Sequence, residues 1–160
     1  MGAKTDALAR QFEGKAREAV ATLERLGEAD WKKVTAAEKW TVGVTAHHLA
    51  GGLGAVAGIV SGISSGGPSR GGFTRAMLDE MNAQHAKEHA DCTRAETLAL
   101  FQKGAATAST VVRGLNDDQL SKSGTVFTDV PPMTAERLIM LGLLGHIDEH
   151  MGSIRNTVGR

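Results

Sequence analysis

The sequence predicts an all-α protein built as a helix bundle. No stretch alternates apolar and polar residues with the period of two that is typical of strands. Apolar residues instead recur at helical spacing over several long segments, and all three prolines lie outside these segments. Long amphipathic helices joined by loops in one small chain pack into a bundle. We expect residues 1–160 to form a single domain, since a chain of this length can bury one substantial core.

The first helix is expected over residues 5–26, followed by a linker over residues 28–40. Gly27 is a suitable stop between the two. The helix has charged residues on one face and an apolar stripe on the other, which comprises Leu8, Phe12, Ala16, Ala19, Leu23 and Leu26.

The second helix, over residues 41–63, requires a membrane check because it carries no Lys, Arg, Asp or Glu. Gly54, Gly58 and Gly62 also have the GxxxG spacing of close-packed membrane helices. Against a span, the apolar residues are mostly Ala, Gly and Val, two adjacent histidines interrupt the segment, and no basic cluster flanks it. We therefore expect a helix buried in protein, in which the glycines let a neighbouring helix approach.

Loops and caps define the remaining helices. A Gly/Ser-rich loop is expected over residues 64–72, and a third helix over residues 74–90. Thr93 and Glu96 have the capping-box spacing, so a fourth helix begins there and ends near residue 115. After an irregular connection over residues 116–132, a last helix is expected over residues 134–157.

Composition restricts the partners and the cellular setting. The formal net charge is zero, which removes the electrostatic argument for nucleic acid and weakens the one for anionic membranes. The single cysteine, Cys92, excludes an internal disulfide framework and fits a reduced, cytoplasmic setting. The N-terminal segment lacks the apolar stretch of a secretory signal.

All six histidines fall into three close pairs, namely His47 with His48, His85 with His89, and His146 with His150. Residues four apart lie on one helical face, one turn from each other, so both rings of such a pair can bind one metal ion. In the last helix, a helical projection places His146 and His150 at the edge of the core-facing side, together with Ile139, Met140, Leu143, Ile147, Met151 and Ile154.

Two alternatives stay open from the residues. His85, His89 and Cys92 form a second candidate set for zinc, or a supporting group beside the first site. In the second helix, periodicity does not decide whether His47 or His48 faces a metal.

Two segments carry a family resemblance. "KWTVGVTAHHLAGGLGAV" is followed about a hundred residues later by "LIMLGLLGHIDEHMGSIR". The shared pattern is a Trp, a His-Leu pair eight residues later, and H-x-x-x-H in the last helix. Together these resemble the DinB/YfiT-like superfamily, whose relatives include mycothiol-dependent maleylpyruvate isomerases and thiol S-transferases. The resemblance covers about residues 12–155 and implies an up-and-down-type four-helix bundle.

The resemblance also implies a metal site with one open position. Its ligands would be His48, His146 and His150, with His47 a neighbour, and its metal zinc, nickel or iron. An open position at a three-histidine site is typical of catalytic metals. The expected function is therefore a divalent-metal-dependent hydrolase or a thiol-dependent transferase or isomerase, acting on a small molecule with water or a low-molecular-weight thiol.

Three residues are candidate proton carriers in such an enzyme by position, namely His47, His85 and Glu149. The family implies a homodimer, and we expect neither nucleic-acid nor membrane binding. Two alternatives to the enzyme remain: a non-catalytic metal-binding or interaction module, dimeric and stress-related, and a bundle whose neutral histidines bind no metal. A structural site would be closed by a fourth ligand, for which Asp148, Glu149, His47 or Cys92 are candidates.

Overall fold

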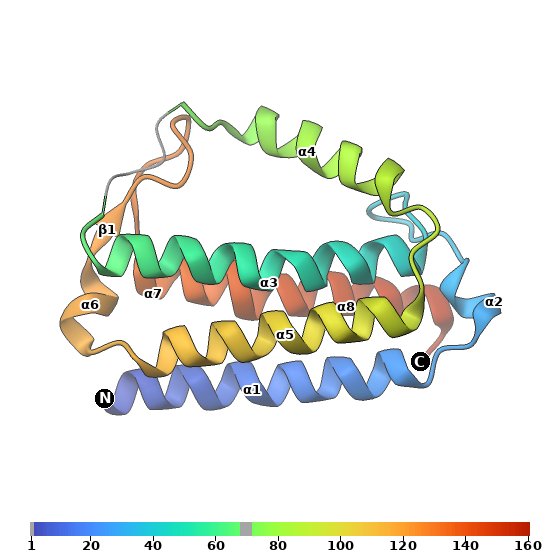
Figure 1. Ribbon diagram of the computed structural model, residues 1–160, viewed down its shortest axis with the longest axis horizontal. Coiled ribbons are helices and arrows are strands. Elements are labelled where there is room, and N and C mark those ends of the chain that lie inside the picture. The colour runs from blue at the N-terminus through green and yellow to red at the C-terminus, as the bar shows by residue number, and fades with distance from the viewer. Residues whose placement is uncertain (1, 68–71) are drawn as a thin grey trace.

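Four helical segments pack side by side in the computed structural model, which describes residues 2–67 and 72–160 (Figure 1). The expected all-α four-helix bundle is confirmed. Its members are α1 (Ala3–Glu24), α3 (Val42–Ser64), α5 (Arg94–Arg113) and a last continuous segment made of α7 (Ala135–Leu138), η1 (Ile139–Leu144) and α8 (Gly145–Val158).

The core lies between these four segments and is made of aliphatic and aromatic side chains. All six residues of the apolar stripe expected in the first helix are buried, as the amphipathic pattern predicts. Complete burial of a Leu or Phe side chain contributes about 1.5–3 kcal/mol, so these residues hold the segments together. The largest fully buried side chains include Phe12, Leu23, Leu49, Leu53, Phe101, Ile139, Leu143, Met151 and Ile154.

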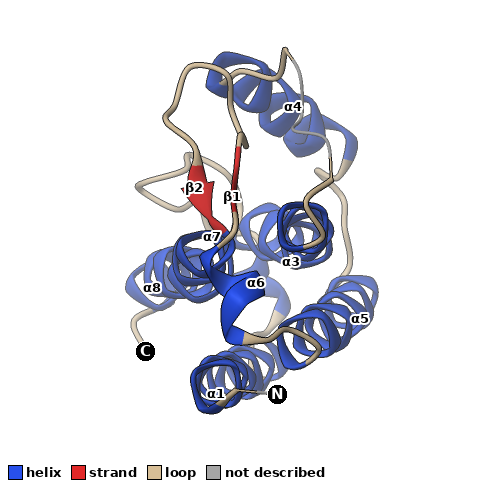
Figure 2. Cartoon of the chain, turned by 90° about the vertical axis from the view of Figure 1, so that its left-hand side faces the viewer, coloured by secondary structure: helices blue, strands red, loops and turns tan. Residues whose placement is uncertain are grey.

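Helix α4 (Arg75–Glu88) returns the chain from one end of the bundle to the other. Because of this return, α3 and α5 run in the same direction, which is the departure from a simple up-and-down order (Figure 1). Viewed along the bundle, α4 lies outside it, on the far side of α3 from α1 (Figure 2). The Thr74 side chain caps α4 by accepting a hydrogen bond from the Met77 backbone N–H, but none of the residues of α4 is buried.

The capping box of Thr93 and Glu96 forms as expected, and α5 begins directly after it. Short elements in the connections were not expected: α2 (Glu28–Trp31), α6 (Asp117–Ser121), and strands β1 (Ser123–Gly124) and β2 (Met133–Thr134), which pair antiparallel. None exceeds five residues, which is too short to show a period in the sequence. Residues 68–71 of the expected Gly/Ser loop lie outside the described residues.

Helix α3 is long and apolar enough to cross a membrane by length and composition, but 44% of its most apolar window is buried inside the protein. It packs against α5, α8 and η1, as a core helix does. The expected role of the GxxxG glycines is wrong, because a Cβ at Gly54, Gly58 or Gly62 would meet no neighbouring atom within 4 Å.

The last helical segment contains a π-helical stretch, η1, directly before the histidine pair. A π turn holds about one residue more than an α turn, so the directions of the residues before it shift relative to those after it. Met140 is consequently 52% exposed, although a regular α-helix would place it inward. The other five apolar residues of the projected face are buried as predicted.

Candidate metal centre

The structure brings His48, His146 and His150 together between α3 and α8. Ring nitrogens from the three residues all lie within 4.8 Å of one another. The ring centroids are 5.1 Å apart for His48 and His146, 4.9 Å for His48 and His150, and 4.5 Å for His146 and His150. We call these three residues the first histidine group. His150 is buried, whereas the other two are half-buried.

Two neighbours on the α3 side shape the space around this group. Gly52 lies one turn after His48, and a Cβ at this position would come within 2.7 Å of Nε2 of His146. The missing side chain therefore makes room for the His146 ring. On the other side of His48, the Trp40 ring packs edge-on at a centroid distance of 5.2 Å and restricts the rotation of the imidazole.

Glu38 is a site residue that the sequence did not reveal. One carboxylate oxygen, Oε1, lies 2.8 Å from Nδ1 of His150, and the other accepts a 2.6 Å hydrogen bond from the Ser153 hydroxyl. An ionised carboxylate only accepts hydrogen bonds, so Nδ1 of His150 carries the proton and Nε2 keeps its lone pair for a metal. Glu38 lies in the 28–40 connection, where no periodic pattern marks it.

The backbone next to Glu38 is held in an unusual conformation. Lys39 has a φ of 63°, in the left-handed region that residues other than glycine seldom adopt. Hydrogen bonds between Thr35 and Trp40 close the loop around it, with the Thr35 backbone N–H 2.8 Å from the Trp40 carbonyl. This closed loop fixes the direction in which the Glu38 carboxylate points.

The ring environments favour the neutral, metal-binding form of histidine. Burial, reinforced by the neighbouring imidazoles, lowers the pKa of His48 to about 4 and that of His146 to about 3. Burial alone would raise the pKa of Glu38, but hydrogen bonds from Ser153, Thr35 and His150 outweigh it, and the pKa is lowered. At neutral pH the rings of His48 and His146 are thus uncharged, and together with His150 beside the Glu38 carboxylate they form a donor set that fits a divalent transition metal.

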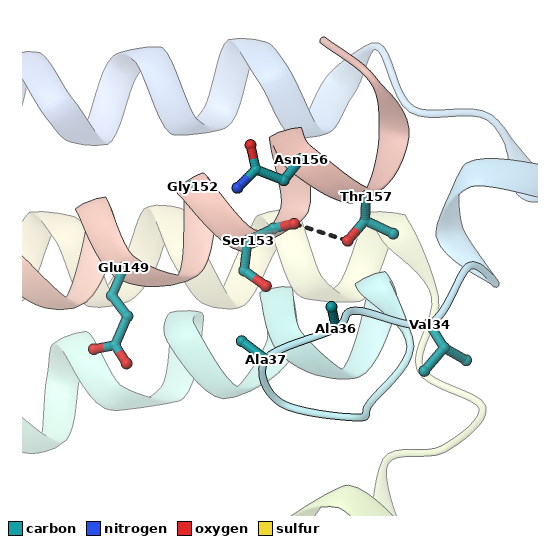
Figure 3. Close-up of a pocket in the computed structure, with 8 residues that line it drawn as sticks. All are labelled: Val34, Ala36, Ala37, Glu149, Gly152, Ser153, Asn156 and Thr157. Carbon is teal, nitrogen blue, oxygen red and sulfur yellow. Dashed lines mark hydrogen bonds between the residues drawn. The ribbon is translucent and has the colours of Figure 1, made fainter.

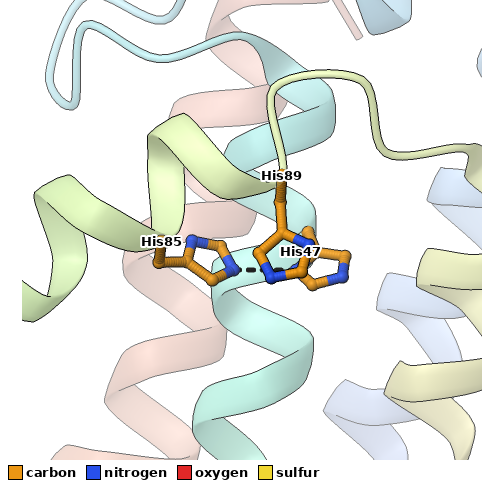
Figure 4. Close-up of side chains that lie close together, drawn as sticks. All are labelled: His47, His85 and His89. Atoms are coloured by element: carbon orange, nitrogen blue, oxygen red, sulfur yellow. Dashed lines mark hydrogen bonds between the residues drawn. The ribbon is translucent and has the colours of Figure 1, made fainter.

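His47 is adjacent to His48 in the chain but joins a different set. Its Nδ1 lies 2.8 Å from Nε2 of His85, and its ring stacks on that of His89 with centroids 4.1 Å apart (Figure 4). Ring nitrogens of these three residues also lie within 4.8 Å of one another, and we call them the second histidine group.

The predicted set of His85, His89 and Cys92 is therefore corrected, because His47 takes the place expected for Cys92. Helix α4 ends at Glu88, so Cys92 lies beyond the helix and does not share a helical face with the two histidines. The cysteine side chain is part of the buried core, and burial raises the pKa of its thiol. Its backbone carbonyl accepts a 2.9 Å hydrogen bond from the Trp31 indole.

Glu149, the remaining proton-carrier candidate, is exposed and belongs to neither histidine group. It lines a surface groove of about 530 Å³ between α8 and the loop at residues 34–37 (Figure 3). None of the histidines lines this groove. The groove reaches the first group only indirectly, through Ser153, whose hydroxyl is bonded to Glu38.

Comparison with known families identifies one match. The sequence profile of the mycothiol maleylpyruvate isomerase N-terminal domain matches residues 12–141. The matched segment contains His48 and the whole second histidine group, and it ends before His146 and His150. No functionally curated protein matches the chain.

Solved structures share the fold at low sequence identity. The mycothiol-dependent maleylpyruvate isomerase superposes with a TM-score of 0.74 at 11% identity, over 94% of this chain and 60% of that one. A mutant of that isomerase gives a TM-score of 0.75 at the same identity and coverage. YfiT from Bacillus subtilis, a probable metal-dependent hydrolase with an unusual four-helix bundle topology, gives 0.72 at 17% identity, over 99% of this chain and 90% of YfiT. These similarities establish the fold, and this chain spans 60% of the isomerase's length.

Proposed function

The chain belongs to the mycothiol maleylpyruvate isomerase N-terminal domain family, and on this basis we propose that it is a divalent-metal-dependent enzyme. His48, His146 and His150 are the proposed metal ligands. The observation that carries the proposal is the convergence of three imidazoles on one point, with the Glu38 carboxylate beside Nδ1 of one of them. Histidines held by a carboxylate in this way are common in metalloenzymes.

The number of ligands favours a catalytic site over a structural one. Structural zinc sites in proteins have four protein ligands, whereas catalytic sites have three and leave a position for water or substrate. Within residues 2–67 and 72–160, none of the candidates for a fourth ligand belongs to the first histidine group, whether Asp148, Glu149, His47 or Cys92. The three-ligand count therefore supports an enzyme.

The protein residues have defined tasks in this proposal. His48, His146 and His150 would hold a divalent ion, which would supply the Lewis acidity that favours ionised water or thiol near neutral pH. Glu38 keeps the proton on Nδ1 of His150 and orients its ring. Among the proton-carrier candidates, His85 has a ring contact with a proposed ligand, since its centroid lies 5.9 Å from that of His48. Glu149 is exposed and belongs to neither histidine group, so position favours it less.

The reaction follows one of two routes that the relatives suggest. In the first, a low-molecular-weight thiol such as mycothiol is the nucleophile in an isomerisation or transfer, a route suggested by the mycothiol dependence of the isomerase. In the second, water is the nucleophile in a hydrolysis, a route suggested by the description of YfiT as a probable metal-dependent hydrolase. Zinc, nickel or iron fits three imidazoles on either route. The alternative to both is a non-catalytic metal-binding module.

Elemental analysis of untagged protein tests the metal site. We expect the wild type to contain metal. A His146→Ala/His150→Ala variant should lose the metal that the first histidine group binds. Glu149→Gln is the matched control, because it lies between the two histidines in the chain and is exposed. A wild type that takes up no metal even after reconstitution with zinc, nickel and iron(II) would sink the proposal.

Activity measurements separate the two routes and the non-catalytic alternative. The reconstituted protein would be assayed for maleylpyruvate isomerisation with and without mycothiol, and with ester and amide substrates without thiol. Turnover that requires mycothiol supports the first route, and turnover of esters or amides supports the second. Stoichiometric metal without turnover in either assay favours the binding module.

We also propose a cytoplasmic homodimer that binds neither nucleic acid nor membranes. The zero net charge supports the absence of nucleic-acid and membrane binding, and the single cysteine fits a reducing compartment such as the cytoplasm. Light scattering coupled to size-exclusion chromatography tests the homodimer, because a dimer has twice the 16.8 kDa mass of one chain.

A further inference from the structure

The second histidine group is separate from the three metal ligands proposed above, and it connects helix α3 with helix α4. His47 is on α3, at the edge of the bundle core, and is 7% exposed. His85 is in the last turn of α4, and His89 is its C-cap residue. All three rings point toward one another (Figure 4). Since α4 has no buried residue, this cluster brings the C-terminal end of α4 to the bundle.

The nitrogen atoms of this group are close enough to share an ion. Nδ1 of His47 and Nε2 of His85 lie 2.8 Å apart, and two tetrahedral ligands, each about 2.0–2.1 Å from an ion, lie roughly 3.3 Å apart, so the two rings need to separate only slightly to hold an ion between them. A ring nitrogen of His89 lies within 4.8 Å of the other two ligand atoms, so the His89 ring must rotate toward them to reach an ion that they share. The stacked rings of His47 and His89 are already 4.1 Å apart between centroids.

Protein contacts leave this group incompletely satisfied. Nδ1 of His85, the ring nitrogen that does not face His47, is buried and has no hydrogen-bond partner among the described residues. A buried nitrogen without a partner costs free energy, and core histidines that serve only packing usually find one. No carboxylate belongs to the group, so its ligands are imidazole nitrogens alone, which suit zinc, nickel, cobalt or copper rather than magnesium or calcium.

We propose that His47, His85 and His89 bind a second divalent transition-metal ion. The two histidine groups are adjacent, because His47 and His48 are consecutive on α3 and the His85 ring contacts the His48 ring. The two groups share no residue, so each ion has its own three ligands. This second site does not rest on the proposed function, since none of its three ligands is a ligand of the first site and its ion is counted separately.

Metal stoichiometry at saturation tests the proposal. The protein would be stripped with chelator, incubated with excess zinc, desalted and analysed for zinc per chain. We expect two equivalents in the wild type, one in His85→Ala/His89→Ala, one in His146→Ala/His150→Ala, and none in the quadruple variant. Lys87→Ala is the control, because Lys87 is exposed on α4 between the two histidines and should leave both equivalents in place.

Loss of a histidine on α4 should not unfold the bundle, because α4 contributes nothing to the buried core. Circular dichroism of each variant checks this. Hydrogen exchange in the His146→Ala/His150→Ala background is a second readout. There, zinc should slow exchange of the α4 amides severalfold, and the further His85→Ala/His89→Ala change should remove the effect.

The outcomes distinguish the second site from the first. One equivalent in the wild type that is lost with His146 and His150 would overturn the second site and leave the proposed function standing. Two zinc equivalents per chain in the His85→Ala/His89→Ala variant would also overturn the second site. One equivalent that survives without His146 and His150, and is lost without His85 and His89, supports the second site whatever becomes of the first.

Discussion

At the scale of single residues, two consecutive histidines on α3 belong to different groups. Positions one apart on a helix point about 100° away from each other, so His47 turns toward α4 and His48 toward α8. The i,i+4 spacing of His146 and His150 was enough to predict that these two rings would meet. The choice between His47 and His48 depends on which helix packs on each side of α3, and local periodicity carries no information on that.

Glu38 could not be found from the sequence for a related reason. Its carboxylate reaches His150 across 112 positions of chain, from a loop closed by the left-handed Lys39. Nothing in the segment between Trp31 and Trp40 distinguishes this glutamate from a solvated one. Loops position residues through tertiary contacts, and such contacts leave no repeating pattern.

Removing the negative charge of Glu38 should weaken metal binding. In a Glu38→Gln variant, the amide has no charge to hold the Nδ1 proton of His150, so the ring is a poorer ligand. We expect zinc affinity at the first histidine group to fall about 10- to 100-fold, measured by competition with a chromophoric chelator in the His85→Ala/His89→Ala background. The Glu149→Gln control should bind as tightly as its parent, and equal affinities for both variants would contradict the role given to Glu38.

A second residue-scale prediction concerns the space left by Gly52. In Gly52→Ala, the new Cβ would meet Nε2 of His146 at 2.7 Å, so the ring must move away from His48. Zinc affinity should fall roughly tenfold or more, as when a metal ligand loses its support. Gly51→Ala, one residue earlier, meets nothing within 4 Å and should keep full affinity while stabilising α3 by up to about 1 kcal/mol. Titration calorimetry of both variants decides the matter, and an unchanged Gly52→Ala would refute the steric argument.

At the scale of elements, the long amphipathic helices and the capping box of α5 were predictable because each has a signal inside its own segment. The stripe of α1 and the Thr93–Glu96 pair are such signals. The π-helical stretch η1 has none, since a π turn is selected by the packing of the whole segment against its neighbours. Its effect is visible at Met140, the one residue of the projected face that is exposed.

The close approach of α3 and α5 should be sensitive to added volume. A Cβ at Gly104 of α5 would lie 3.0 Å from the Ala50 carbonyl oxygen and 3.2 Å from the Leu53 Cβ. A backbone carbonyl cannot rotate away, so we expect Gly104→Val to lower the free energy of unfolding by about 1–3 kcal/mol in urea denaturation. Gly58→Ala on α3 meets nothing within 4 Å and serves as the control, with no loss of stability expected. Equal stability of Gly104→Val and the wild type would show that the two helices are free to separate.

At the scale of the whole molecule, the parallel course of α3 and α5 was beyond prediction from periodicity. Helical stripes show which face of each helix is buried, but antiparallel and parallel neighbours bury their faces equally well. The order follows from α4, whose own face is not buried, so its sequence gives no sign of where it lies.

Stability of the metal-free protein should depend on pH through the buried imidazoles. The pKa is lowered to about 4 for His48 and to about 3 for His146, against about 6.5 in the unfolded chain. Below pH 6.5 the unfolded chain therefore binds protons that the folded chain does not, and stability falls as the pH is lowered toward these values. At pH 5 the loss should be about 1–2 kcal/mol for each of the two histidines.

Urea denaturation in the presence of chelator, at pH 7.5 and pH 5, measures this loss. A His48→Gln/His146→Gln variant lacks these two groups and keeps His47 and His85, whose pKa burial also lowers, so it should lose less stability over the same interval but not none. If both proteins lose the same amount, the burial of these rings does not control the response to acid.

The return of the chain along α4 also sets a minimum length for the connection between α3 and α5. Helix α3 has 23 residues, so the ends of α3 and α5 that are joined lie about 35 Å apart along the bundle. An extended chain covers this distance in about ten residues. The connection over residues 65–93 is roughly three times as long, so crossing the bundle does not account for its length. Deletions that shorten it should leave the fold intact as long as about ten residues remain, and they would remove the one segment that carries His85 and His89 to α3.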